Sequence, residues 1–576
     1  MNDMNLLINE LYRNKLIGGI DRALSDFCAK LAREDSPELR LAVALTSCRI
    51  SSQNHASLNL RQCSGMTVGE FFASELLLGG EMPPDHLLQT RLPDFTACLE
   101  QIDRAGLDLL TVFRGERLYL RRYAVYEQRV ADIILARAAV HEERDWSAAL
   151  DRYRLEGEQR LAAATALNGN LSIITGGPGT GKTTTFARIL GIMLEQGPLR
   201  IRLAAPTGKA AQRMTQSVNA ACDRLQAHNP ALTNIPREAS TIHKLLGYIP
   251  HSSAFRHNRD NPLPVDLLVI DECSMIPLAL LCKLLEAVPD EARIIMLGDK
   301  NQLEPVEVGA PFNDICSSGN PLLARRIAQL TKSYRFAADR GIGKLSAAVL
   351  SGVPEQVEAL VAAPPPEVRF TEVDARNWTQ KLQAAAVFFQ RCRLMPDLAE
   401  AFAHFSQFRI LTACRRRFLG CDNINDYMIE FNGGKAPFKG LPIMITANDY
   451  NEMLFNGDTG MIWQDDPDAP LFAAFPEADG TFRTINLNLL PPWEPAYAIT
   501  VHKAQGSEAE NILLMLPSDG ARILCRELFF TGVTRAKNSV EIWYDDPAVL
   551  TGPALESQAQ RGGLADRLDD AEATRS

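Results

Sequence analysis

Short apolar runs alternate with helical patterns from about residue 146 to about residue 545. The first set of runs is Leu171 to Thr175, Ile201 to Ala205, Leu267 to Ile270 and Arg293 to Leu297. A second set is Arg409 to Thr412, Ala496 to Val501, Ile512 to Leu516 and Val540 to Tyr544. Such runs are typical of central strands in a parallel sheet, because helices cover both faces of these strands. The two sets predict two α/β domains in tandem.

The rest of the chain predicts three further parts. Helical patterns from Asp21 to Leu31 and from Leu39 to Cys48 indicate a mainly helical N-terminal domain over residues 1–145. Short strands and turns between 432 and 495, such as Asn456-Gly457-Asp458, indicate a small β insertion in the second α/β domain. We expect the α/β domains to span 146–335 and 336–549, and the polar residues 550–576 to form a flexible tail.

Composition limits the class of protein. The chain has 576 residues, 46% of them hydrophobic and 23% charged, which is typical of several globular domains and excludes a wholly disordered, collagen-like or coiled-coil chain. With 60 Lys and Arg against 70 Asp and Glu, the net charge of −10 argues against a general affinity for nucleic acid. It does not exclude a local basic groove, because association responds to the local field.

The cysteines and the apolar runs bear on location. The 12 Cys residues are scattered and form no Cys-x-x-Cys pair. An iron–sulfur cluster on the four N-terminal Cys is one interpretation, and buried structural thiols are the favoured one. No run reaches the ~20 apolar residues of a membrane-spanning helix, and no secretory signal is recognisable. We therefore expect a cytoplasmic protein with reduced cysteines.

The strongest motif is Gly176-Gly177-Pro178-Gly179-Thr180-Gly181-Lys182-Thr183, which lies between a predicted strand and a helical pattern over Thr184 to Leu194. This is the context of a phosphate-binding loop, in which glycines let backbone amides surround phosphate oxygens at a helix N-terminus. We expect Lys182 to reach the β- and γ-phosphates of a nucleotide and Thr183 to ligate Mg²⁺. An ordinary glycine turn is the alternative, and the filled positions argue against it.

A second motif, Asp271-Glu272, ends the strand predicted from Leu267 to Ile270. A carboxylate there can hold Mg²⁺ opposite the phosphate-binding loop, and its neighbour can activate the attacking water. We assign the metal to Asp271 and the base to Glu272. Alone, such a pair is an ordinary acidic strand end, but downstream of a phosphate-binding loop it predicts an NTPase.

Four later segments select the type of NTPase. They are Gly298 to Val306, Tyr334-Arg335, Val501 to Glu508 and Thr531 to Lys537. Gln302, in the first segment, is expected to sense the γ-phosphate. A nucleotide held between two domains needs cations to stabilise the transferring phosphoryl group, and Arg335 and Arg535 are the candidates. A solvated surface residue is the alternative for either arginine, and only its place in the series argues against that.

In order and spacing, this series resembles that of superfamily 1 helicases, and most closely the RecD family, the α subunits of the bacterial exodeoxyribonuclease V (RecBCD) complex. The resemblance covers residues from about 110 to 548 and includes Leu118 to Tyr123 and Phe455 to Gly460. It implies two tandem RecA-like motor domains and an SH3-like β module at 432–495 lining a DNA channel. A short insertion at about 247–264 lies where relatives carry a strand-separating pin, and a passive loop is the alternative.

The resemblance implies roles for individual residues in binding nucleotide. Gln159 matches the glutamine that reads adenine, although an exposed helix residue is its alternative, and Tyr334 matches the aromatic residue that packs on the base. Gln505 and Gly506 are implied to approach the phosphates, and Glu508 to contact the ribose. Thr184 completes the nucleotide-binding set.

Other residues are implied to contact single-stranded DNA. They are Pro206, Thr207, Lys209, Thr241, His243, Thr500, His502 and Lys503. Hydroxyls, backbone amides and lysines suit contacts to phosphates without readout of base sequence. For His243, a core histidine is an equal alternative.

The resemblance therefore implies an ATP- and Mg²⁺-dependent DNA helicase that moves 5′ to 3′. It also implies a role with the β and γ subunits in double-strand break repair by homologous recombination. We expect the nuclease activity of such a complex to belong to a partner. Residues 1–145, with 17 Lys and Arg against 21 Asp and Glu, are the expected docking region. The alternatives are a free-standing RecD-like helicase, a non-translocating NTPase switch, and a structural subunit with an inactive site.

Overall fold

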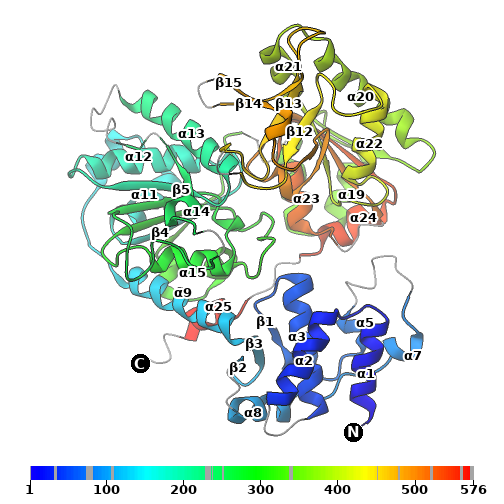
Figure 1. The fold of residues 1–576 in the computed structure, drawn as a ribbon. Coiled ribbons are helices and arrows are strands. Elements are labelled where there is room, and N and C mark those ends of the chain that lie inside the picture. The colour runs from blue at the N-terminus through cyan, green and yellow to red at the C-terminus, as the bar shows by residue number, and fades with distance from the viewer. Residues whose placement is uncertain are drawn as a thin grey trace.

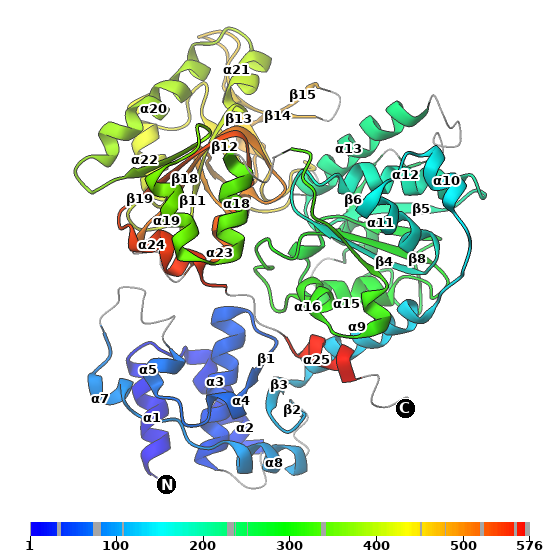
Figure 2. The same ribbon diagram turned by 180° about the vertical axis from the view of Figure 1, so that it is seen from behind.

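Figures 1 and 2 show an N-terminal domain and two α/β domains in the computed structural model. The structure describes residues 2–31, 36–72, 82–105, 109–226, 235–236, 238–249, 252–335, 341–449, 452–477, 480–518, 523–557 and 562–570.

The first α/β domain, which we call motor domain 1, is built on a six-stranded parallel sheet. In order across the sheet, its strands are β6 (Ser240–Thr241), β5 (Ile201–Ala205), β7 (Leu267–Ile270), β8 (Arg293–Gly298), β4 (Leu171–Gly176) and β9 (Ile327–Leu330). Along β7, Leu267 and Val269 pack into one hydrophobic core, and Leu268 and Ile270 pack into another. Successive side chains point to opposite faces, so a sheet covered on both faces needs a continuous apolar run.

Helices cover both faces of this sheet. One face is covered by α10 (Ser147–Arg152), α11 (Gly157–Leu167), α12 (Lys182–Leu194) and α13 (Gly208–Gln226). The other is covered by α9 (Arg121–Ala139), α14 (Ile242–Leu246), η2 (Cys273–Met275), α15 (Leu278–Glu286), α16 (Pro311–Ser317) and α17 (Pro321–Ala324). Both α12 and α13 begin just after a strand ends, so their N-termini lie at the carboxyl edge of the sheet, where ligands bind in such folds.

The second α/β domain, motor domain 2, has a five-stranded parallel sheet. Its strands, in order, are β10 (Val368–Glu372), β19 (Ala536–Tyr544), β18 (Ala509–Leu516), β11 (Phe408–Thr412) and β17 (Ala498–Thr500). One face is covered by α18 (Gly341–Ser351), α19 (Pro354–Ala362) and α23 (Arg526–Val533), and the other by α20 (Trp378–Leu394), α21 (Leu398–Phe405) and α22 (Cys421–Asn432). The predicted tandem parallel-sheet α/β architecture is confirmed.

The predicted β insertion is a five-stranded antiparallel sheet. Its strands, in order, are β15 (Phe482–Asn486), β14 (Phe472–Pro476), β13 (Thr459–Trp463), β12 (Pro442–Ile445) and β16 (Trp493–Pro495), and η3 (Leu487–Leu489) follows β15. Its inner face shares a core with α20, α21 and α22. The insertion is therefore packed onto motor domain 2, and its SH3-like character stays a prediction.

The N-terminal domain has a hydrophobic core of its own that extends from Leu7 to Leu118. Its helices are α1 (Asn2–Arg13), α2 (Gly19–Leu31), α3 (Pro37–Gln53), α4 (Leu60–Cys63), α5 (Val68–Phe71), α7 (Asp85–Leu88) and α8 (Thr96–Ala105). A small antiparallel sheet joins them, in the order β1 (Ser57–Asn59), β3 (Arg117–Leu120), β2 (Leu110–Phe113). All four N-terminal cysteines are buried in this core, and among the described residues no group of His, Cys, Asp or Glu could hold a metal ion.

The expected boundary at residue 145 is too late. Helix α9 packs against α15, and its residues Val130 and Ile134 belong to the core of motor domain 1. The buried guanidinium of Arg137 donates to the carbonyls of Val288 and Ala292. Because α9 supplies an apolar face and a buried cation to motor domain 1, that domain begins at about residue 121 in packing terms.

The expectation of a flexible tail from residue 550 is wrong for the described residues there. Elements α24 (Ala548–Thr551) and η6 (Pro553–Leu555) pack on motor domain 2, whereas α25 (Gly563–Asp570) returns to α9 and α16 of motor domain 1. Figure 1 shows α25 in red beside α9. Leu564 and Leu568 are fully buried there. Most residues of this tail are polar, so the apolar stripe of α25 was not recognised from the sequence. Residues 558–561 and 571–576 of the predicted tail lie outside the described residues.

Candidate nucleotide and DNA sites

The phosphate-binding loop lies between β4 and α12, as predicted. Gly179 and Gly181 have φ of +77° and +82°, a region that side chains disfavour, so the loop conformation depends on glycine there. The Lys182 ammonium donates to the carbonyls of Gly176 and Gly177, the latter at 3.2 Å. The lysine therefore spans the loop at the position where phosphates would bind.

The predicted adenine-binding residues meet beside this loop. A Cβ on Gly181 would lie 2.9 Å from the amide nitrogen of Gln159 and 3.7 Å from the Tyr334 ring. The Tyr334 backbone N–H donates to the Gly179 carbonyl at 2.8 Å, which holds the segment after β9 against the loop. The Tyr334 ring is 64% exposed, so its face is available to a base.

The two acidic residues stand at the end of β7, opposite Lys182. Burial raises the pKa of Asp271 to about 6, the Glu272 charge adds to this, and Lys182 opposes it. Glu272 has φ of +51°, an uncommon conformation for a side-chain-bearing residue that turns it toward the same cavity. Asp271 and Thr183 both line that cavity. A carboxylate and a hydroxyl that line one cavity are oxygen donors of the kind that Mg²⁺ prefers.

The cavity that these residues line has a volume of about 660 Å³. It receives residues from both motor domains, and Gln302, Arg335, Glu508 and Arg535 are among them. Arg535 is 2% exposed, and its Nε donates to the Thr531 carbonyl at 3.1 Å. Arg335 Nη1 lies 2.7 Å from Glu508 Oε1. The structure thus brings together the predicted arginines, the predicted γ-phosphate sensor and the predicted ribose contact.

Arg213 is a residue of this cavity that the sequence interpretation missed. Its guanidinium is ion-paired with Glu508 across the two motor domains. Burial raises the pKa of Glu508, but Arg213 and Arg335 outweigh it and lower that pKa to about 2. Arg213 lies four residues after Lys209, so the helical period alone indicated that both share one face of α13.

Gln302 connects the cavity to the domain interface. Its amide donates to Asp299 at 3.1 Å, and both side chains are buried. The next residue, Leu303, makes two hydrogen bonds with motor domain 2. Its N–H donates to Thr531 Oγ1 at 3.1 Å, and its carbonyl accepts from Gln505 Nε2 at 3.2 Å. Gln505 is therefore engaged at the interface, and its predicted contact with phosphate stays a prediction.

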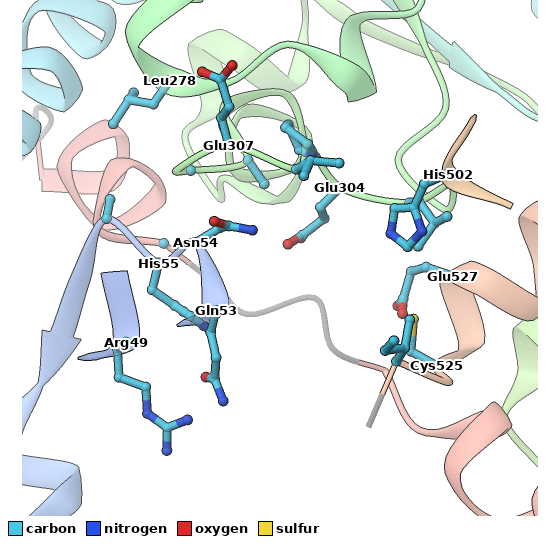
Figure 3. A pocket seen from close by; sticks show the side chains of 18 of the residues that line it. Arg49, Gln53, Asn54, His55, Leu278, Glu304, Glu307, His502, Cys525 and Glu527 are labelled. Carbon is cyan, nitrogen blue, oxygen red and sulfur yellow. The ribbon is translucent and has the colours of Figure 1, made fainter. Parts of the chain in front are cut away.

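A second cavity, of about 1,500 Å³, lies between both motor domains and the N-terminal domain. Five predicted DNA contacts line it, namely Thr207, Lys209, Thr500, His502 and Lys503. Figure 3 shows His502 on the motor side of this cavity, with side chains of α3 and the residues after it, among them Gln53 and His55, facing it from the N-terminal domain. The Asn54 carbonyl accepts from Gly309 N at 2.8 Å, which fixes that wall to motor domain 1.

Lys209 is less accessible than a residue in an open groove would be. Burial and, to a lesser extent, nearby arginines lower its pKa to about 7, against the opposing charge of Asp458. The turn Phe455–Asp458 of the β insertion covers the start of α13, since a Cβ on Gly208 would lie 2.8 Å from Phe455. Lys503 is also engaged, with Nζ 2.7 Å from Glu494. To bind a phosphate, Lys503 would have to leave this ion pair.

Three predicted DNA contacts do not line this cavity. Thr241 Oγ1 accepts from Lys244 N at 3.2 Å and caps α14. The His243 ring packs on Phe255, with centroids 5.7 Å apart, and burial lowers its pKa. Phe255 belongs to the insertion at 247–264, which folds back on motor domain 1. Pro206 precedes α13. For His243, the structure favours the packing role.

Comparison with known proteins identifies the family. Residues 159–308 match the family model of an AAA domain, and residues 495–542 match that of a UvrD-like helicase C-terminal domain. The RecBCD enzyme subunit RecD of Mycolicibacterium smegmatis is 39% identical over 475 residues, which cover 79% of this chain and 82% of that protein. This chain belongs to the RecD family. RecD of Haemophilus influenzae is 34% identical over 479 residues, 72% of either chain.

Two further proteins are similar to this chain over part of its length or at low identity. The ATP-dependent RecD2 DNA helicase of Deinococcus radiodurans is 30% identical over 78% of this chain but over 58% of its own length. Among solved structures, Bacteroides Pif1 bound to ssDNA aligns with 73% of this chain and 96% of its own, at 16% identity and a TM-score of 0.41. Among the described residues, no helix of this RecD-family chain is long and apolar enough to span a membrane.

Proposed function

We propose that this chain is an ATP-dependent DNA helicase that moves 5′ to 3′ and acts as a subunit of a RecBCD-type helicase–nuclease complex in double-strand break repair. One observation carries the motor assignment. Gln302 lines the nucleotide cavity, and its neighbour Leu303 lines the larger cavity with the predicted DNA contacts. Motor domain 2 holds Leu303 from both sides through Thr531 and Gln505. Gln302, which would sense a change at the γ-phosphate, is therefore next in sequence to a residue of the DNA-facing interface.

Hydrolysis would depend on groups from both motor domains. Lys182 leaves the loop carbonyls and binds the β- and γ-phosphates of ATP. Arg335 and Arg535 neutralise the charge that develops on the transferring phosphoryl group, and Glu272 accepts the proton of the attacking water. Mg²⁺, held by Thr183 and Asp271, would neutralise phosphate charge. Closure around ATP and opening after hydrolysis would alternate the grip of the two domains on a strand.

The partner assignment rests on the family and on one surface. Ile20, Phe27 and Leu31 of α2 are 71%, 51% and 52% exposed, and their spacing of seven and four residues places them on one helix face. Leu6 and Tyr12 of α1 are also exposed. We assign docking of a partner subunit, in the complex the β or γ subunit, to this apolar stripe. We also propose a cytoplasmic location, which suits cysteines that form no disulfide bond among the described residues.

The test uses tailed duplexes and one variant. The parent chain, alone and with candidate β and γ subunits, should displace a strand from a 5′-tailed duplex and leave a 3′-tailed duplex intact. Lys182→Gln should lower single-strand-stimulated ATP hydrolysis by ~10³-fold, since the phosphates lose their cation, and should retain subunit assembly. Near-normal hydrolysis by this variant would overturn the site assignment.

The same assay separates the alternatives. A non-translocating NTPase switch would show neither stimulation by single-stranded DNA nor strand displacement. A structural subunit would show no hydrolysis at all. A free-standing RecD-like helicase would unwind DNA but would not co-elute with β and γ subunits on size exclusion.

A further inference from the structure

The first turns of α13 connect the two cavities. Lys209 lines the larger cavity with the predicted DNA contacts, and Arg213 lines the nucleotide cavity. The two residues are four apart in one helix, so they lie on the same face and move together. Neither the family motifs nor the sequence interpretation assigned a role to Arg213.

Arg213 reaches motor domain 2 through a single carboxylate. Glu508, whose side chain is 10% exposed, pairs with Arg213 and also with Arg335, at 2.7 Å. Just upstream, Gly506 has φ of +68°, and a Cβ there would lie 3.8 Å from Ala210 of α13. The segment carrying Glu508 is thus packed directly on the first turns of α13, and one motor domain 2 carboxylate is held by two motor domain 1 arginines.

We propose that Arg213 is a positioning residue that acts through Glu508 and makes the nucleotide site respond to DNA. A strand that contacts Lys209 shifts the start of α13. Arg213 moves with it and carries Glu508 to the place where a nucleotide needs it, while Arg335 is released from Glu508 to the phosphates. The inference rests on the proposed function, because it requires a nucleotide and a DNA strand in the two cavities.

The experiment measures ATP hydrolysis by the full chain against ATP concentration, with and without a saturating thymidine oligonucleotide. For Arg213→Ala we expect the KM for ATP with oligonucleotide to rise ~10-fold, as for loss of a charge-assisted pair. We expect the stimulation of the rate by oligonucleotide to fall at least ~5-fold. Arg213→Lys keeps a charge without the planar fork and should give an intermediate KM. Arg202→Ala, which changes an exposed arginine of β5, is the matched control.

A double variant separates action through Glu508 from direct contact with ATP. If Arg213 acts through Glu508, Arg213→Ala combined with Glu508→Gln will be no worse than the more defective single variant. Fold-changes that multiply, or an unchanged KM and stimulation in Arg213→Ala, would overturn the inference and leave the motor assignment intact. A parent chain without DNA-stimulated hydrolysis would overturn both, and unchanged melting curves would show that the variants are folded.

Discussion

At the scale of single residues, two neighbouring carboxylates at the end of β7 make negative charge unfavourable in the nucleotide site. Asp271 is a partly buried carboxylate beside a second carboxylate, and its raised pKa reflects the free-energy cost of charging it there. The Glu272 backbone N–H donates to Asp271 Oδ1 at 2.8 Å and only partly offsets it. Binding of a cation there would remove the free-energy cost of charging Asp271. These residues therefore favour ligand binding over stability of the fold.

This arrangement predicts a pH-dependent stability. An acid whose pKa rises from 3.8 to about 6 on folding stabilises the fold when protonated, and that contribution is lost as the pH rises through about 6. Asp271→Asn cannot ionise and can keep the backbone hydrogen bond. It should therefore be more stable than the parent at pH 8, by about 1–3 kcal/mol, with the difference shrinking toward pH 5. Melting curves of both proteins at the two pH values measure this. A destabilised variant at pH 8 would contradict it.

At the scale of elements, α25 holds the N-terminal sheet and motor domain 1 together. Asp566 pairs with Arg117 of β3 at 3.0 Å, and Arg567 pairs with the buried Glu127 of α9 at 3.2 Å. On either side of these two residues in the sequence, Leu564 and Leu568 pack into the core that contains α9. The element is short, so its order depends on this packing and not on helix propensity.

Leu568→Ala tests this role. Removing a fully buried leucine should lower the free energy of unfolding by about 2–5 kcal/mol, because the transfer energy is lost and a cavity remains. The KM for ATP should stay unchanged, since α25 is remote from the residues that line the nucleotide cavity. Denaturant titration and ATPase kinetics measure the two effects. Leu550→Ala, a buried leucine of α24 on motor domain 2, is the matched comparison.

At the scale of the whole molecule, three bodies meet around one large cavity while the outer face of the N-terminal domain carries an apolar stripe. The larger cavity collects polar side chains of all three bodies, as Figure 3 shows for His55, Glu304 and His502. In contrast, Ile20, Phe27 and Leu31 face solvent on α2. Under the proposed function, the cavity would hold the DNA strand and the α2 surface would bind the protein partner.

Ile20→Ser combined with Phe27→Ser should separate these surfaces. Losing two large apolar anchors should weaken assembly with β and γ subunits by at least ~100-fold in Kd, because such anchors dominate interfaces. ATP hydrolysis on single-stranded DNA by the isolated chain should stay within ~2-fold of the parent. Pull-down or size exclusion measures assembly. The same two changes at Val387 and Leu394, exposed apolar residues of α20, are the control. Normal assembly of the α2 variant would place docking elsewhere.

The sequence by itself determined the parts that depend on residues close to one another in the chain. The phosphate-binding loop needs glycines and a lysine at fixed spacing, so Gly176 to Thr183 could be recognised from the sequence. Strands covered on both faces need continuous apolar runs, so strands such as β7 could be recognised as well. The tandem parallel sheets follow from the same runs.

Only the tertiary structure decided which distant residues meet. Arg213 and Glu508 are 295 positions apart, and Arg114 and Asp570 are 456 apart, so no local pattern announces either pair. Helix α9 belongs to motor domain 1 because its apolar face packs against α15. Helix α25 is ordered because two of its leucines pack into the same core. Burial also set the pKa of Lys209, which depends on a turn of the β insertion far along the chain. Contacts of this kind arise from closing long loops, and the sequence supplies their residues but not their partners.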